Sequence, residues 1–213
     1  MTEASPLGAR TLQELLDDVA APVPDPGGGA ASAVVLAVGV ALAQMVAGYS
    51  PASDGAGPDP TERLHGLRAD VLDLATVDGD ASAGFASAIA VVGPGRDAAI
   101  AAAVRAAIVS ALSIAEAAGR LLTELSALEA HAPAKVHADL QVAAALAAAV
   151  VRASAVNVGA CLEMVVPTPA GDAGDAGLTD RIAGLDALRE RADAMVGRGT
   201  APGQRMDPLV GPA

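Results

Sequence analysis

Apolar residues recur along this chain at the three- and four-residue spacing of helices, and short segments rich in proline, glycine and aspartate separate them. Residues 11–21 predict a short amphipathic helix, since Thr11 suits the N-cap and Glu14 follows at the capping-box spacing. Longer helices are predicted over residues 27–50, 61–76, 81–92, 96–130 and 134–165, and a polar amphipathic helix over 178–196. The chain is therefore expected to be all-helical.

The composition indicates how these helices pack. Hydrophobic residues make up 53% of the chain, but aromatic residues only 1%. Most of the apolar residues are Ala, Leu and Val, and Ala both favours helix and lets helix axes approach closely. We expect an alanine-rich antiparallel bundle with two long central helices that dimerises through its helices. The expected organisation is a helical domain over residues 1–166, a linker over 167–177, and a C-terminal helix with a disordered tail over 178–213.

Two stretches, residues 29–49 and 140–166, reach the ~20 apolar residues that a membrane span requires. The first is rich in small residues, contains Gln44, and has no flanking Lys or Arg. The second contains Arg152 and Glu163, which are costly inside a bilayer. These features favour buried bundle helices over membrane spans, and no membrane is expected as a partner.

Charge and cysteine content narrow the function classes. The formal net charge is −12, and the basic residues form no stripe, so nucleic-acid binding is not expected. Cys161 is the single cysteine, which excludes a disulfide framework and a cysteine-based zinc site. His65, His131 and His137 lack the spacing of metal ligands, and we expect no metal. A reduced, cytoplasmic setting fits this cysteine usage.

A run of three glycines opens the first long helix, in the sequence Pro26-Gly27-Gly28-Gly29-Ala30-Ala31-Ser32. Glycine lets another group approach the backbone closely, and the free N–H groups of a helix start attract an anion such as a carboxylate. A hinge between two helices is the alternative interpretation. No strand precedes the run and no Lys-Ser or Lys-Thr follows it, so neither a dinucleotide fingerprint nor a phosphate-binding loop is present.

Three motifs, in order, resemble the cyclodeaminase/cyclohydrolase family that acts on one-carbon folates. They are Pro26–Gly29 followed by Gln44-Met45-Val46-Ala47, then Asp80-Ala81-Ser82-Ala83, and then Asp139-Leu140-Gln141-Val142-Ala143-Ala144 with Asn157-Val158. The resemblance covers residues 12–165. It implies a folate-type small molecule as ligand and substrate contacts from Pro26, Gly27, Gly28, Gly29, Ser32 and Asp139, with Asp80 as the catalytic group.

Helix order gives a geometric expectation for these residues. If consecutive helices alternate in direction, and Asp78-Gly79-Asp80 interrupts a helix, then Asp80 and Asp139 lie at the glycine end. Asn157 is ~27 Å along the helix from Asp139, and is read as packing or as a contact from a second subunit. Two simpler roles stay open, since Asp80 can be a helix N-cap and Asp139 can pair with Lys135.

The resemblance implies an enzyme without metal or redox cofactor, in which a carboxylate serves as acid/base and stabilises positive charge. Hydrolysis of 5,10-methenyltetrahydrofolate is preferred over deamination of 5-formiminotetrahydrofolate, because no formiminotransferase domain accompanies the chain. The alternative is a diverged family member that binds a ligand or serves as an assembly subunit. It is favoured by the missing lysine stretch after Tyr49 and by Gly84, where the family has an aromatic residue.

Overall fold

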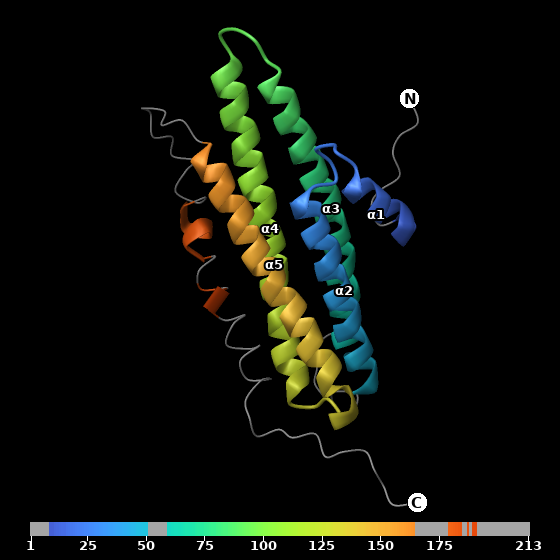
Figure 1. Cartoon of the computed structure of the whole chain (residues 1–213). Helices are drawn as coiled ribbons and strands as arrows, with labels where there is room; N and C mark the ends of the chain where they lie inside the picture. The colour runs from blue at the N-terminus through green and yellow to red at the C-terminus, as the bar shows by residue number, and fades with distance from the viewer. Residues whose placement is uncertain (1–8, 51–58, 165–178, 185–186, 188, 191–213) are drawn as a thin grey trace, which may run out of the picture.

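A computed structural model describes residues 9–50, 59–164, 179–184, 187 and 189–190. Within these residues the chain is all-helical, as predicted, and four long helices form an antiparallel bundle (Figure 1). They are α2 (Gly28–Tyr49), α3 (Pro60–Ile89), α4 (Arg96–Glu129) and α5 (His137–Glu163), and a 3-10 turn (Ala134–Val136) precedes α5. The predicted linker at 167–177 and most of the predicted C-terminal region lie outside the described residues.

The four helices form two layers. In Figure 1, α2 and α5 lie side by side in front of α3 and α4, and the turn between α3 and α4 rises beyond the other helices. Each helix contacts its two neighbours around the bundle, and α2 also contacts α4 across it. The antiparallel alternation places the start of α2 next to the second half of α3 and the end of α5.

Small side chains fill the centre of the bundle, as the composition predicts. Gly39 of α2 faces α4 and α5, where a methyl group in its place would lie 3.3 Å from Leu121 and 3.5 Å from Leu146. Large residues complete the core above and below these contacts, and Leu36, Leu112, Ile114, Leu122 and Leu140 are almost completely buried. Alanine on facing surfaces thus brings the helices close together, and leucine fills the remaining volume.

The structure corrects one boundary. The predicted break at Asp78-Gly79-Asp80 is absent, because α3 continues from Pro60 to Ile89 as a single helix. Gly79 lies inside this helix, where a methyl group in its place would overlap the carboxyl of Asp25. The glycine therefore accommodates a neighbouring segment and does not end the helix. This change removes one reversal of chain direction from the predicted topology.

The first helix, α1 (Leu12–Ala20), starts with the predicted capping box between Thr11 and Glu14. Its apolar face is mostly open, since Leu15 is buried but Leu12 is 70% exposed. Residues 179–184 are also helical, and Arg181 there pairs with Glu116 of α4 at 2.6 Å. The described part of the C-terminal segment thus docks on the outside of α4.

Three of the described helices are long and apolar enough to cross a membrane, judged by length and composition. They are α2, α4 and the segment Ala134–Glu163. In the bundle only 50%, 39% and 33% of their most apolar windows, respectively, are buried. Packing in the core of one chain therefore does not account for the exposed apolar side chains of these helices, such as Val38 and Val156.

Candidate active site beneath the glycine turn

The glycine run forms the entry to α2. The Asp25–Pro26 bond is cis, Pro26 is buried, and Gly27 is the N-cap of the helix. Gly28 is exposed, whereas Gly29 is buried. A methyl group at Gly29 would overlap the carboxyl of Asp78. The buried glycine therefore lets α3 bring a carboxyl directly against the start of α2.

Asp78 is the polar centre of this contact. Its side chain is only 7% exposed, and the buried Ser110 of α4 donates a hydrogen bond to Oδ1 at 2.9 Å. The backbone N–H of Ala30, in the first turn of α2, also donates to this carboxyl. The helix start that was expected to attract an anion therefore contacts a carboxyl group from its own chain.

Burial raises the pKa of the Asp78 carboxyl above its ordinary value, and the charge of Asp25 adds to the increase. The hydrogen bonds from Ser110 and Ala30 oppose this shift, because they stabilise the charged form. The net direction is upward. A carboxyl with a raised pKa changes protonation state closer to neutral pH, which suits a general acid or base.

Two residues near the end of α5 complete this end of the bundle. The Oδ1 atom of Asn157 lies 3.9 Å from where a methyl group at Gly28 would be. Cys161 is half-buried, and its thiol pKa is raised by burial and by the charge of Asp78. The site therefore draws one residue or more from each of the four long helices.

Two of the predicted site residues, Ser32 and Asp80, lie at the glycine end of the bundle with Asp78. Ser32 donates its hydroxyl to the carbonyl of Gly28 at 2.7 Å, so it is bonded within α2. Asp80 lies on α3 at the level of the glycine turn, but its side chain is exposed. Two residues turn a helix by ~200°, which points Asp80 away from the face that Asp78 occupies.

The expectation that Asp139 lies at the glycine end of the same chain is wrong. It lies in the first turn of α5, close to Lys135, whose Nζ is 4.4 Å from the centre of the Tyr49 ring at the far end of α2. Because α3 is continuous, the bundle has one reversal fewer than predicted. The direction of α5 is therefore inverted, so Asn157 takes the place expected for Asp139.

The spacing of apolar residues in the sequence indicates that Asp78 is buried, but the predicted helix break interrupted this pattern. The buried positions Leu64, Leu67, Val71 and Ala75 follow one another at spacings of three and four residues. Continuing this spacing by three residues reaches Asp78, on the same buried face. Since aspartate is almost never buried without a partner, this position in an apolar stripe marks a polar site.

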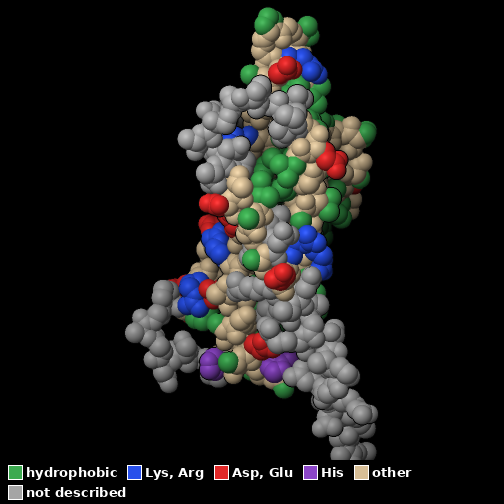
Figure 2. All heavy atoms as spheres, turned by 90° about the vertical axis from the view of Figure 1, so that its left-hand side faces the viewer, with side chains coloured by type: hydrophobic (Ala, Val, Ile, Leu, Met, Phe, Trp, Pro, Cys, Tyr) green, Lys and Arg blue, Asp and Glu red, His purple; other side chains and the backbone are tan. Residues whose placement is uncertain are grey.

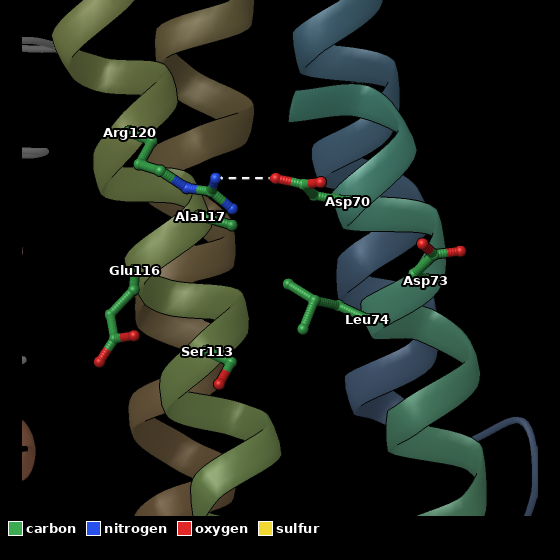
Figure 3. A pocket seen from close by; sticks show the side chains of 7 residues that line it. All are labelled: Asp70, Asp73, Leu74, Ser113, Glu116, Ala117 and Arg120. Atoms are coloured by element: carbon green, nitrogen blue, oxygen red, sulfur yellow. Dashed lines mark hydrogen bonds and ion pairs between the residues drawn. The ribbon is translucent and has the colours of Figure 1, made fainter. Parts of the chain in front are cut away.

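A separate groove of about 490 Å³ lies between α3 and α4 (Figure 3). It is lined by Asp70, Asp73, Leu74, Ser113, Glu116, Ala117 and Arg120. The guanidinium group of Arg120 in this groove is already paired, since it donates to the Asp70 carboxylate at 2.8 Å. Charged side chains of both signs also run along the neighbouring face in Figure 2, which is typical of a solvated surface.

Among the described residues, no group of three or more His, Cys, Asp or Glu side chains is placed to hold a metal ion.

These features define a class of protein, a helical bundle in which, among the described residues, the buried carboxyl of Asp78 lies under a glycine-lined helix start. Residues 11–166 match the family model described as formiminotransferase-cyclodeaminase, and the chain belongs to that family. It is also similar to the crystal structure of formiminotetrahydrofolate cyclodeaminase from Thermotoga maritima, with 25% identity and a TM-score of 0.74. That match covers 90% of this chain and 98% of the other. No curated protein matches the chain.

Proposed function

We propose that this protein acts on a one-carbon tetrahydrofolate, either deaminating 5-formiminotetrahydrofolate or hydrolysing 5,10-methenyltetrahydrofolate. The observation that carries the proposal is the buried Asp78 carboxyl with its raised pKa, held beneath the glycine turn. Membership of the formiminotransferase-cyclodeaminase family supports it, as does the likeness to a bacterial cyclodeaminase.

The two reactions are additions and eliminations at the same carbon. In deamination, N10 adds to the carbon of the protonated formimino group, a proton passes from N10 to the departing nitrogen, and ammonia leaves. In hydrolysis, water adds to the methenyl carbon, the bond from this carbon to N5 breaks, and a proton is released. Each reaction needs a group that can both accept and donate a proton, but no electron transfer.

We assign this proton transfer to Asp78. Its charged form can take a proton from N10 or water, and its neutral form can return one to the leaving nitrogen. Ser110 is a positioning residue, because its hydrogen bond fixes one carboxyl oxygen at 2.9 Å. Gly28 is the exposed part of the turn, and Asn157 lies beside it, so these two residues are placed to contact the substrate.

The proposal is tested with purified protein and both folates, following the ultraviolet absorbance of the methenyl compound. Asp78→Asn is expected to lower kcat by ~10²–10⁴-fold, the usual contribution of a positioned acid or base. Asp73→Asn, on the exposed side of the same helix, is the matched control and should keep wild-type turnover. Activity is expected to survive treatment with EDTA, since neither reaction requires a metal.

Asp80→Asn tests the assignment made from the family motif. A large loss of kcat in Asp80→Asn together with normal turnover in Asp78→Asn would transfer the catalytic role to Asp80. Wild-type protein that turns over neither folate would contradict the proposed function. It would favour the alternative of a diverged, non-catalytic member that binds a ligand or serves as an assembly subunit.

A further inference from the structure

The segment before α2 places a second carboxyl against α3. Asp25 is an exposed residue, but its carboxyl packs on Gly79, where Cγ of Asp25 lies 2.9 Å from the position of an added methyl group. Gly79 is buried inside the helix, and its missing side chain provides the room. The preceding residue, Asp78, makes the same kind of contact in the opposite direction, with its carboxyl against Gly29 of α2.

These two contacts join the same two segments around the glycine turn. Each segment supplies one buried glycine and one carboxyl, and each carboxyl fills the space over the glycine of the other segment. Asp78 and Gly79 are neighbours in α3, so their outward directions differ by about 100°. The Asp78 carboxyl therefore lies inside the bundle, whereas the carboxyl of Asp25 lies on the side that is open to solvent.

The charge of Asp25 acts on Asp78. Around the Asp78 carboxyl, α2 contributes the Ala30 N–H and no charged residue, and α4 contributes the Ser110 hydroxyl. From α5 comes the Cys161 thiol, whose raised pKa keeps it neutral at pH 7. The two carboxyls therefore carry one negative charge together when Asp78 is protonated, and two when it is ionised.

This balance of charge suits a cation. The free N–H groups at the start of α2 amount to about half a positive charge, which one ionised carboxyl already exceeds. With Asp25 beside it, the open surface at Gly28 is negative whether or not Asp78 holds its proton. The carboxyls of its own chain thus replace the anion that the glycine turn was expected to bind.

We propose that Asp25 binds the positively charged one-carbon group of the substrate, while Asp78 exchanges the proton. This inference rests on the proposed function, because both folates carry a positive charge at the reacting carbon. The methenyl compound is an amidinium, and the formimino group is protonated. The one-carbon end of the folate therefore lies at the glycine turn, and its glutamate carboxylates point away from the two aspartates.

This division of roles favours the reactant of the hydrolysis. Water addition converts the cation to a neutral 10-formyl compound, so the attraction to Asp25 is lost when the product forms. A bound cation also offsets the charge of Asp25, which otherwise opposes ionisation of Asp78. Asp78 therefore releases its proton more readily once the substrate is present, and its charged form is then available to accept a proton from water.

The charge of the ligand separates this role from a structural one. Asp25→Asn keeps the shape of the side chain and is expected to raise KM for 5,10-methenyltetrahydrofolate roughly 5- to 50-fold, between the effect of an exposed ion pair and one shielded from water. The inhibition constant of 5-formyltetrahydrofolate, whose one-carbon group is neutral, should stay the same. An equal rise in both constants would show a general loss of structure and overturn the proposal.

Asp97→Asn is the matched control for net charge. It removes one negative charge from the first turn of α4, ~20 Å along the helix from Ser110, and should leave both constants unchanged. A rise in KM equal to that of Asp25→Asn would assign the effect to the net charge of the protein and overturn the specific role of Asp25.

The titration of Asp78 tests the pair without any assay of activity. Removal of the negative charge in Asp25→Asn should lower the pKa of Asp78, so its carboxyl should titrate at lower pH than in the wild type. Carbon-13 NMR of the carboxyl groups measures this, with Asp78→Asn to assign the signal. An unchanged titration would show that the two carboxyls do not interact and overturn the proposal.

Gly79→Ala tests whether the placement of the Asp25 carboxyl matters. The added methyl group overlaps this carboxyl and displaces it, while its charge remains. KM for the methenyl compound should rise as it does in Asp25→Asn, and circular dichroism checks that the helices remain. A folded Gly79→Ala protein with the KM of the wild type would overturn the proposal.

Binding separates this inference from the proposed function. If the wild type acts on neither folate, the proposed function fails, and calorimetry with 5,10-methenyltetrahydrofolate then decides the role of Asp25. Binding that weakens in Asp25→Asn but not in Asp97→Asn supports recognition of the cation. A wild type that does not bind the methenyl compound overturns it.

Discussion

Two opposing influences act on the carboxyl of Asp78. Removal from water favours its neutral form, whereas hydrogen bonds from Ser110 and the Ala30 N–H favour its charged form. The first influence is larger, so the folded protein holds the proton of Asp78 more tightly than the unfolded chain does. By linkage, the contribution of Asp78 to stability is most favourable at low pH and is lost as pH rises through its raised pKa.

The raised pKa of Asp78 predicts how the stability of a variant changes with pH. Asp78→Asn cannot ionise, so its free energy of unfolding, relative to wild type, should improve as pH rises from about 4 toward neutrality. Urea unfolding at several pH values measures the difference. A wild type that gains stability over Asp78→Asn as pH rises would contradict the raised pKa.

The close contact at Gly29 gives a second prediction at this scale. Gly29→Ala should destabilise the fold by about 1–3 kcal/mol, because the added methyl overlaps the Asp78 carboxyl and forces the helices apart. Gly66→Ala in α3 has open space around it and should stabilise the fold by up to ~1 kcal/mol through helix propensity. Thermal or urea unfolding compares the two. An equal effect of both substitutions would show that the Gly29 contact is not tight.

The local sequence predicted correctly how α1 begins, but it did not predict how far α3 extends. Local residues determine α1 well, since the Thr11–Glu14 capping box forms as its spacing predicts. Its apolar stripe nevertheless leaves Leu12, Leu16 and Val19 exposed, with Leu15 alone in the core. In α3 the local signal at Asp78-Gly79-Asp80 indicated a break, but packing of the segment around Asp25 uses the same glycine inside a continuous helix.

The loose attachment of α1 gives an element-scale prediction. Thr11→Ala should speed amide hydrogen exchange in α1 about fivefold, since a lost cap of this kind costs ~1 kcal/mol in helix stability. The midpoint of global unfolding should stay nearly unchanged, because α1 opens locally without the bundle. Exchange read by mass spectrometry, with α4 as internal reference, separates the two effects. A matching loss of protection in α4 would show that α1 unfolds only with the bundle.

For the molecule as a whole, charge and apolar surface are segregated. Acidic and basic side chains occupy α3 and much of α4, as the pairs of Arg63 with Glu124 and of Arg120 with Asp70 show. In the front layer of Figure 1, made of α2 and α5, α2 carries no charged residue, and α5 adds exposed apolar side chains such as Val142 and Val156 to its exposed Arg152. One chain therefore has a polar side suited to solvent, and it leaves exposed apolar side chains along α2.

If two copies associate through their long helices, as the composition predicts, the wild-type unfolding midpoint should rise with protein concentration. Calorimetry over a hundredfold range of concentration should show this increase for the wild type. Val38→Glu places a charge on the exposed face of α2 and should unfold at a midpoint independent of concentration. A constant midpoint for the wild type over this range would argue against association through the helices.

The sequence alone was sufficient for the features that depend on local spacing and composition. Helical periodicity and alanine content predicted an all-helical bundle, and the family match confirms the family that the three motifs indicated. The capping box of α1 and the start of α2 after the glycines follow from residues a few positions apart. These are short-range interactions, and the residues that make them are visible together in the sequence.

The tertiary structure decided which distant residues meet. Asp78 in place of Asp80 faces the core, and Asn157 in place of Asp139 lies near Gly28, because α3 does not break at Gly79. A glycine between two aspartates has the same local preference whether it ends a helix or makes room for another segment. Only the approach of Asp25 to α3 distinguishes the two, and that contact joins residues 54 positions apart, a separation that local spacing cannot encode.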